Sequence, residues 1–138
     1  MFQGQWYYQG RFLFIGEPWG RRTTVLRVTD HAGGDIVIKE TYRHHKRRSK
    51  EEEILTHIHD DGDILGVVRF KGAEHVTTGN KTLKCAAKGE NTLRTKERFA
   101  LLDSGCRLLT AKTVNDLLEA VYDALEGLHG FHMERRPL

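Results

Sequence analysis

The sequence predicts an α+β fold in which a five-stranded antiparallel sheet is combined with one short helix and one long carboxy-terminal helix. Three observations lead to this prediction. Short β-rich runs separated by Gly-rich turns fill the first third of the chain. A stretch of helical period, at about residues 114–129, closes it. With 138 residues, of which 38% are hydrophobic and 30% charged, the chain has the size and composition of a single globular domain.

The first three strands follow from alternation and from the turns between them. Residues 11–15 are an aromatic and aliphatic run that Gly16 ends, and residues 23–28 alternate as a half-buried strand does. Turn-forming residues 30–34 then lead into a third strand at residues 35–40. Short strands joined in this way predict an antiparallel meander.

A short helix is predicted directly after these strands. A basic stretch, residues 43–50, leads to Ser49, and Glu52 follows three residues later in the pattern of a capping box. Three apolar residues then share one face of a helix: Ile54, Leu55 and Ile58. We therefore expect a helix at about residues 50–58, ended by the Asp-rich residues 60–63.

Two further strands are expected at residues 64–70 and 99–102. The polar, turn-rich residues 71–97 between them are interpreted as strand fragments around a mobile loop.

The long helix is the clearest element of the sequence. Thr113 is its expected cap, with Asp116 in the acidic first turn, and Gly130 is its expected end. Six apolar residues hold helical spacing: Val114, Leu117, Leu118, Val121, Leu125 and Leu128.

Composition narrows the classes of function. No apolar run approaches the roughly 18 residues of a membrane span, and none has the length of a secretory signal core. We therefore expect an intracellular protein, cytoplasmic or nuclear, with Cys85 and Cys106 as free thiols. The histidine pairs lack a cysteine or acid at zinc-finger spacing, so no metal site is predicted.

The net charge of +3 permits binding to nucleic acid without requiring it. A small basic nucleic-acid binder would use residues 43–50 and 81–98. The glutamates that follow the first of these stretches favour a solvated charged loop instead.

Several residues resemble the nucleotide-binding elements of protein kinases. The strand Ile36-Val37-Ile38-Lys39 resembles the Val-Ala-Ile-Lys strand whose lysine holds the α- and β-phosphates of ATP. That lysine needs a carboxylate from the next helix. Glu51, which precedes Ile54-Leu55 in the order Glu-x-x-Ile-Leu, is the first choice, and Glu53 is the second.

The strand that begins at Val25 resembles the one that follows the kinase glycine-rich loop. This alignment places Gly20 at the central glycine, whereas Pro18 and Thr23 occupy the positions of the flanking glycines. The phosphate-covering loop is therefore degraded, because its backbone must approach phosphates in conformations that a side chain obstructs.

The closer resemblance is to the fungal-type protein kinase family, and it extends over about residues 11–138. Three segments carry it: residues 37–55, which run from the lysine strand into Glu51-Glu52-Glu53-Ile54-Leu55; residues 65–69 (LGVVR); and residues 114–129, which begin Val-Asn-Asp-Leu-Leu. The resemblance implies one partial kinase domain over residues 1–138. Residues 11–105 would be its small lobe and residues 113–130 the first helix of its large lobe.

The resemblance also implies a function and its limits. The family phosphorylates protein Ser or Thr with ATP, and Lys39, Glu51, Gly20 and Val25 would contact the nucleotide. The sequence has no His-Arg-Asp, Asp-Phe-Gly or Ala-Pro-Glu motif, and it stops at about the point where the first is expected. We therefore expect a pseudokinase-like fragment, inactive alone, with weak or vestigial ATP binding, and Mg²⁺ only if the missing lobe is supplied.

The alternative is a non-catalytic interaction module, a regulator or decoy of kinases. Its partner would be another kinase or protein bound through the exposed carboxy-terminal helix, since no large lobe covers that helix. Neither nucleic acid nor a membrane is expected as a partner.

Overall fold

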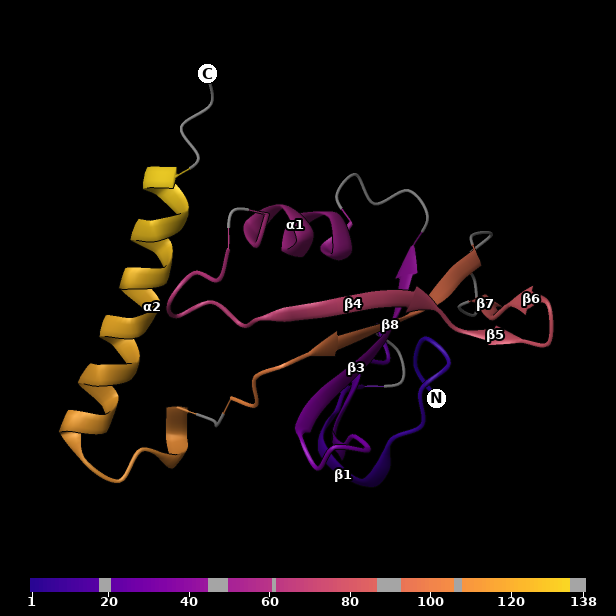
Figure 1. Ribbon diagram of the computed structural model, residues 1–138, viewed down its shortest axis with the longest axis horizontal. Helices are drawn as coiled ribbons and strands as arrows, with labels where there is room; N and C mark the ends of the chain where they lie inside the picture. The colour runs from indigo at the N-terminus through magenta and orange to yellow at the C-terminus, as the bar shows by residue number, and fades with distance from the viewer. Residues whose placement is uncertain (18–20, 45–49, 61, 87–92, 106–107, 135–138) are drawn as a thin grey trace.

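A six-stranded antiparallel sheet forms the centre of the computed structural model, with one helix beside it and one at its end (Figure 1). The structure describes residues 1–17, 21–44, 50–60, 62–86, 93–105 and 108–134. Of residues 131–134 it describes the backbone only. The elements follow in this order: β1 (Tyr8–Ile15), β2 (Thr24–Thr29), β3 (Asp35–His44), α1 (Glu51–Ile58), β4 (Phe70–His75), β5 (Thr77–Thr78), β6 (Lys81–Thr82), β7 (Lys84–Ala86), β8 (Leu93–Leu101), a 3-10 turn (Leu108–Thr110) and α2 (Val114–Glu134).

The strand order in the sheet is β1-β2-β3-β8-β4, and β7 also pairs with β8. The α+β class, the antiparallel sheet, the short helix and the long carboxy-terminal helix are all confirmed. None of the described helices is long and apolar enough to cross a membrane. Cys85 is a free thiol, and Cys106 lies outside the described residues.

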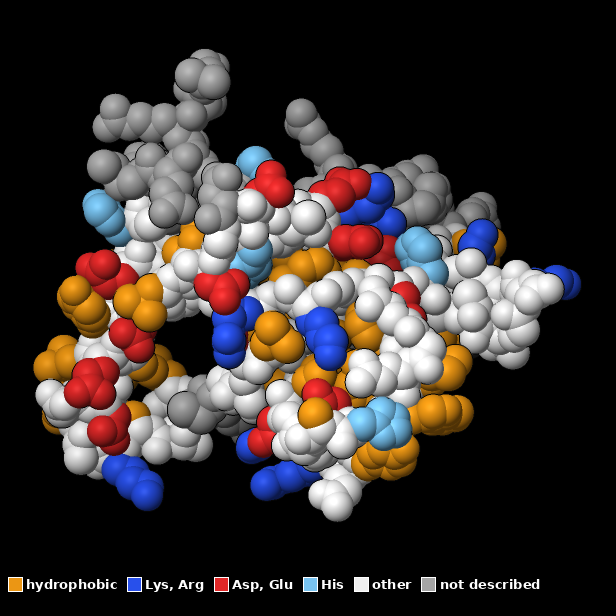
Figure 2. Space-filling view, in the orientation of Figure 1, with side chains coloured by type: hydrophobic (Ala, Val, Ile, Leu, Met, Phe, Trp, Pro, Cys, Tyr) orange, Lys and Arg blue, Asp and Glu red, His pale blue; other side chains and the backbone are white. Residues whose placement is uncertain are grey.

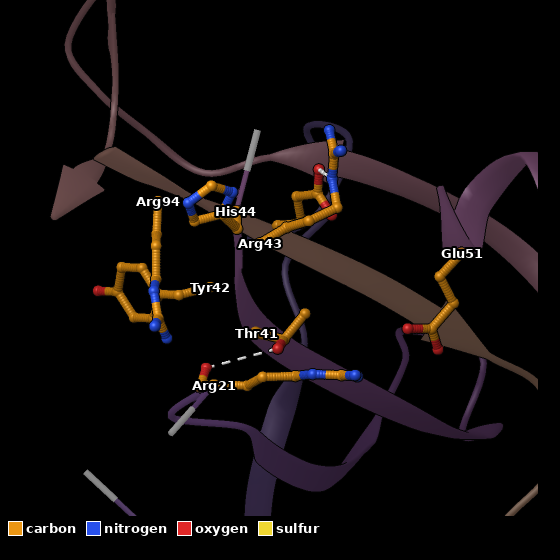
Figure 3. Close-up of a pocket in the computed structure, with 8 residues that line it drawn as sticks. Arg21, Thr41, Tyr42, Arg43, His44, Glu51 and Arg94 are labelled. Carbon is orange, nitrogen blue, oxygen red and sulfur yellow. Dashed lines mark hydrogen bonds and ion pairs between the residues drawn. The ribbon is translucent and has the colours of Figure 1, made fainter. Parts of the chain in front are cut away.

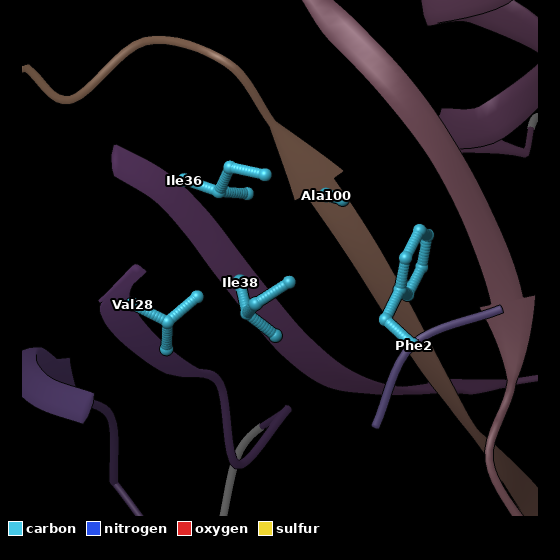
Figure 4. Close-up of a cluster of buried hydrophobic side chains, with 5 residues drawn as sticks. All are labelled: Phe2, Val28, Ile36, Ile38 and Ala100. Atoms are coloured by element: carbon cyan, nitrogen blue, oxygen red, sulfur yellow. The ribbon is translucent and has the colours of Figure 1, made fainter. Parts of the chain in front are cut away.

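A cluster of buried hydrophobic side chains lies on one face of the sheet, where alternate residues of β3 point. Ile36 and Ile38 pack there with Val28, Ala100 and Phe2 (Figure 4). Phe2 is 1% exposed although its partners are at least 26 residues away in the chain. The amino-terminal segment therefore supplies part of the core.

Hydrogen bonds hold that segment to the sheet. Arg98 donates from Nη1 to the carbonyl oxygen of Met1, and the backbone N–H of Gln3 donates to Oε2 of Glu74 over 2.7 Å. Arg98 also donates from Nε to Glu40 over 2.7 Å. Its Nη1 also donates to Glu74 of β4 over 3.0 Å, so one guanidinium joins β3, β4 and the amino-terminal segment to β8.

The prediction of a strand at residues 64–70 is wrong. Residues 64–69 form a turn, and β4 begins only at Phe70. Gly66 adopts φ +78°, a left-handed conformation that breaks extended backbone. The backbone N–H and the guanidinium of Arg69 then donate to the Asp103 carboxylate, the former over 2.7 Å. None of its apolar residues is fully buried: Leu65 is exposed, and Ile64, Val67 and Val68 are half-buried.

Glycines allow helix α2 to lie against that turn. An ideal Cβ built on Gly66 would stand 2.0 Å from the carbonyl oxygen of Asp123, and one on Gly127 would stand 3.2 Å from Gly66. A Cβ on Gly130 would meet Ile64 at 3.0 Å. Gly130 is therefore an interior helix residue where space is short, and the predicted end at residue 129 is five residues early.

The two helix starts differ in how they are capped. Thr113 accepts from the N–H of Asp116 over 3.0 Å, and Asp116 accepts from the N–H of Thr113 over 3.1 Å, so the predicted cap of α2 is present. The N-cap of α1 is Lys50, which makes no side-chain capping hydrogen bond. Ser49, the predicted cap, lies outside the described residues.

The contact between the 64–69 turn and α2 predicts that Gly66→Ala is destabilising. Two effects add: an Ala residue is strained at positive φ by about 1–2 kcal/mol, and its Cβ cannot share the space of the Asp123 carbonyl group. We expect a loss of at least about 2 kcal/mol in the free energy of unfolding in urea, with earlier proteolysis of α2.

Gly33→Ala is the matched control, because Gly33 has φ +83° and nothing within 4 Å of the added Cβ. It should show the backbone strain alone. Equal losses in the two variants would mean that the close approach to α2 contributes nothing.

Candidate functional site

Lys39 lies on the face of the sheet opposite the core. Across the strands it stands beside Val25 of β2 and Phe99 of β8, and Phe99 in turn stands beside Ala73 of β4. Residues directly opposite in antiparallel strands present their side chains on the same face. The Lys39 ammonium is 5.8 Å from the centroid of the Phe99 ring, which is 1% exposed. A buried aromatic ring therefore supports the lysine stem.

Glu51 supplies the carboxylate that Lys39 needs. It is the first residue of α1, and its Oε1 forms an ion pair with Lys39 Nζ. The side chains are 26% and 37% exposed, so the pair is partly shielded from water while remaining accessible. Glu53, the second choice, pairs with Lys50 on the exposed side of the same helix. The structure thus distinguishes the two candidate acids by geometry.

The predicted apolar face of α1 is partly covered. No residue of the helix is fully buried, Leu55 and Ile58 are half-buried, and Ile54 is exposed. At its carboxy-terminal end, His59 Nε2 lies 2.8 Å from the carbonyl oxygen of Val68. The ion pair at one end and this hydrogen bond at the other attach α1 to β3 and to the 64–69 turn.

The β1–β2 connection is attached to β3 near Lys39. Gly20 lies outside the described residues, and so does Pro18. On either side of them, the N–H of Gly16 donates to the carbonyl oxygen of Thr23 over 2.7 Å. Thr23 Oγ1 is 3.2 Å from Thr41 Oγ1. The two arms of the connection are therefore closed at their base and fastened to β3.

Glu40, next to Lys39 in sequence, projects to the core side and anchors β3 electrostatically. Its carboxylate accepts from Lys96 over 2.6 Å and from Arg98. Burial alone would raise the pKa of Glu40, but these two cations outweigh burial and hold the pKa below its ordinary value. The strand that carries Lys39 is thus fixed by charges on its other face.

The sequence predicted Lys39, Glu51 and Val25 as site residues, which stays a prediction, and it did not indicate the residues that support them. The role of Phe99 beneath the lysine depends on a strand register that pairs residues 60 positions apart. Its apolar character had indicated only a strand. Among the described residues, no group of three or more His, Cys, Asp or Glu is placed to hold a metal ion.

A sheet with a helix after its third strand, joined to it by a lysine–glutamate pair, defines a protein kinase-like small-lobe fold. The model of the family described as fungal protein kinase matches residues 12–98, from β1 to β8. The chain belongs to the fungal protein kinase family. The match includes Lys39, Glu51, Gly20 and Val25, and α2 lies outside it. No curated protein and no solved structure was found to match the chain.

The lowered pKa of Glu40 predicts how stability depends on pH. A carboxyl group whose folded pKa lies below its ordinary value of 4.5 stabilises the fold fully above that value. The stabilisation is lost as the pH falls through the folded pKa. We expect Glu40→Gln to cost about 1–3 kcal/mol of unfolding free energy at neutral pH, and progressively less below about pH 4.5.

Urea unfolding of both proteins from pH 7 to pH 3 measures this difference. Glu119→Gln, which removes an exposed acid from α2, is the control and should give a small, nearly constant difference. A Glu40→Gln cost that does not change with pH would contradict the ionic origin of the stabilisation.

Proposed function

We propose that this chain supplies the nucleotide-side part of a Ser/Thr kinase site, binding ATP weakly through Lys39. The ion pair between Lys39 and Glu51 is the observation that carries the proposal. An ammonium held on a rigid strand and oriented by a carboxylate is the arrangement that phosphate binding requires. Val25 stands beside Lys39 and would contact the nucleotide, with Gly20 in the loop that covers the phosphates.

The same residues do not complete phosphoryl transfer by themselves. Kinase catalysis depends on Mg²⁺ held by an aspartate and on a base that accepts the substrate proton, and both belong to motifs that these 138 residues do not contain. Positioning and charge stabilisation account for nearly all of this catalysis. We therefore propose that these residues alone are inactive, and that Mg²⁺ would bind with ATP only when a large lobe is supplied.

Titration with ATP tests the proposal. Half of a cleft covers little of the ligand, so we expect a dissociation constant near 1 mM, measured by nuclear magnetic resonance. Lys39→Met should weaken binding about tenfold, as expected for the loss of a charge-assisted contact. Glu51→Gln should weaken it less, because the lysine remains but is no longer oriented. With Mg²⁺ and a Ser/Thr peptide present, no phosphate should be transferred.

Two matched variants keep the test specific. Lys81→Met removes an exposed lysine of the β5–β6 hairpin, and Glu53→Gln removes the neighbouring acid of α1. Both should bind ATP as the unmodified chain does. Equal weakening by Lys39→Met and Lys81→Met would refute a role for Lys39, and phosphate transfer that Lys39→Met abolishes would refute inactivity.

A second candidate function, an interaction module, is favoured by the surface of α2. Apolar side chains gather along this helix in Figure 2. The six residues of the predicted apolar stripe are 39–73% exposed: Val114, Leu117, Leu118, Val121, Leu125 and Leu128. Contiguous exposed apolar surface of this kind is typical of a protein interface. The partner would be a kinase or another protein that covers this face.

Light scattering after size-exclusion chromatography tests this candidate function. The chain is measured alone and mixed with a purified full-length kinase of this family. We expect a complex that Leu118→Glu disrupts, because a charge at a buried interface position costs several kcal/mol. Glu119→Lys, a charge change at the next residue of the helix, should leave the complex intact. A monomer that binds no kinase would count against the module.

A further inference from the structure

A groove separates helix α2 from the 64–69 turn, and nothing above gives it a role. Its volume is about 820 Å³, which lies within the range of about 300–1,000 Å³ that is usual for ligand pockets. Figure 2 shows the molecule hollowed here, between α2 at the left and the sheet. Three described segments line the groove: residues 63–69, residues 103–105 and the face of α2 that bears Ala120, Asp123 and Ala124.

Small residues leave this groove open. The backbone of α2 comes close to the 64–69 turn at Gly66 and Gly127, where an added Cβ would lie within 3.2 Å of the other segment. About one and two helical turns before Gly127, the helix lines the groove with the methyl groups of Ala124 and Ala120. Side chains this short leave the space between the segments unfilled.

The wall opposite α2 is largely apolar. Ile64, Val67 and Val68 are half-buried there, and Leu65 is 74% exposed. Aliphatic side chains that line a concave surface and still contact water gain free energy when another apolar group covers them. The groove is therefore suited to aliphatic side chains of another molecule.

The charged residues of the lining are mostly acids. They are three aspartates and one arginine: Asp63, Asp103, Asp123 and Arg69. Arg69 donates to Asp103 from Nη2 over 2.6 Å and from Nε over 3.1 Å, and these hydrogen bonds hold the pKa of the Asp103 carboxyl below its ordinary value. One arginine thus balances one of the three aspartates.

The other two aspartates lack a comparable cation within the described part of the chain. Asp63 Oδ1 lies 3.6 Å from Nδ1 of His59, which is too long for a hydrogen bond, and the Asp63 side chain is 64% exposed. The pKa of Arg69 is raised chiefly by Asp103 and to a smaller degree by Asp63. Asp123 forms no ion pair with a described residue, and α2 has no lysine or arginine in its sequence. The groove therefore combines apolar walls with a surplus of negative charge.

We propose that this groove binds a basic amphipathic segment of a partner protein. Aliphatic side chains of the segment lie against the 64–69 turn and the alanines of α2, while its lysines or arginines pair with Asp123 and Asp63. Charge complementarity selects this occupant, because an acidic segment or a nucleic acid would be repelled by the carboxylates. A metal ion is no alternative, since no three acids, histidines or cysteines among the described residues are placed to hold one.

The groove is a different surface from those used in the two functions proposed above. Neither Lys39 nor Glu51 lines it, and none of the six residues of the apolar stripe on α2 does. Leu118 of the stripe and Asp123 of the groove are five positions apart, which places them about 140° apart around the helix. The proposal therefore rests on neither nucleotide binding nor the stripe, and each can fail without the others.

Fluorescence anisotropy with a labelled synthetic peptide of leucine and lysine, about 14 residues long and at helical spacing, tests the groove. We expect saturable binding at low salt although the net charge of the chain is +3. Asp63→Asn combined with Asp123→Asn should weaken binding about tenfold, because two exposed ion pairs are lost. Both side chains are exposed, so the double variant should fold as the unmodified chain does, which its circular dichroism spectrum verifies.

Glu119→Gln combined with Glu126→Gln is the matched control, because it removes two acids of α2 that do not line the groove. Binding should be unchanged. Equal weakening by the two double variants would show that the peptide is attracted to the acidic helix as a whole, and would overturn the proposal. Absence of saturable binding up to about 1 mM peptide would do the same.

Leu65→Ser tests the apolar wall without disturbing a packed side chain. It should weaken peptide binding about fivefold, because the leucine is no longer there to be covered. Leu109→Ser is its control, since Leu109 is 96% exposed and does not line the groove, and it should leave binding unchanged. Equal effects of the two serine variants would contradict a role for the wall.

Two further measurements distinguish other modes of binding. A peptide with glutamate in place of every lysine should not bind, and binding as tight as that of the lysine peptide would overturn selection by charge. Leu118→Glu should not weaken binding of the lysine peptide. Loss of binding in Leu118→Glu, with none in the double aspartate variant, would place the peptide on the apolar stripe and overturn the groove as its site.

Discussion

The position of helix α1 relative to the sheet depends on an ion pair between Lys39 of β3 and Glu51, the first residue of the helix. No residue of α1 is fully buried, but Leu55 and Ile58 are half-buried, so apolar packing and the ion pair act together on this helix. A partly exposed ion pair contributes about 0.2–1 kcal/mol, which is a small constraint for an eight-residue helix. The pair therefore determines where the helix starts relative to the sheet more than it stabilises the fold.

The sheet can present Lys39 to Glu51 because its two faces bear different side chains. Alternate residues of β3 project to opposite sides, so Ile36 and Ile38 pack into the core while Lys39 faces outward. Glu40 returns to the core side, where Lys96 and Arg98 fix it. The strand that carries Lys39 is thus held in place by contacts on the opposite face of the sheet.

The sequence predicted those structural features that depend on contacts between residues close in the chain, and it missed those that depend on distant residues. The third strand and its lysine were predictable because period, turn residues and the following helix lie within about 25 positions. Residues 64–70 were mistaken for a strand because their apolar composition was visible, whereas the positive φ of Gly66 and its contact with Asp123 were not. Phe2 was overlooked for the same reason, since its core partners come from other parts of the chain.

The candidate site likewise has a part that the sequence could predict and a part that required the fold. Glu51 could be proposed from its spacing to Ile54-Leu55, but the choice between it and Glu53 required the geometry that sends Glu53 to Lys50. A small cavity beside Thr41 had no local signal in the sequence, because its walls come from four separate segments of the chain (Figure 3). The basic stretch at residues 43–50 indicated charge, but only the fold shows that Arg43 and His44 line a cavity with Arg21 and Arg94.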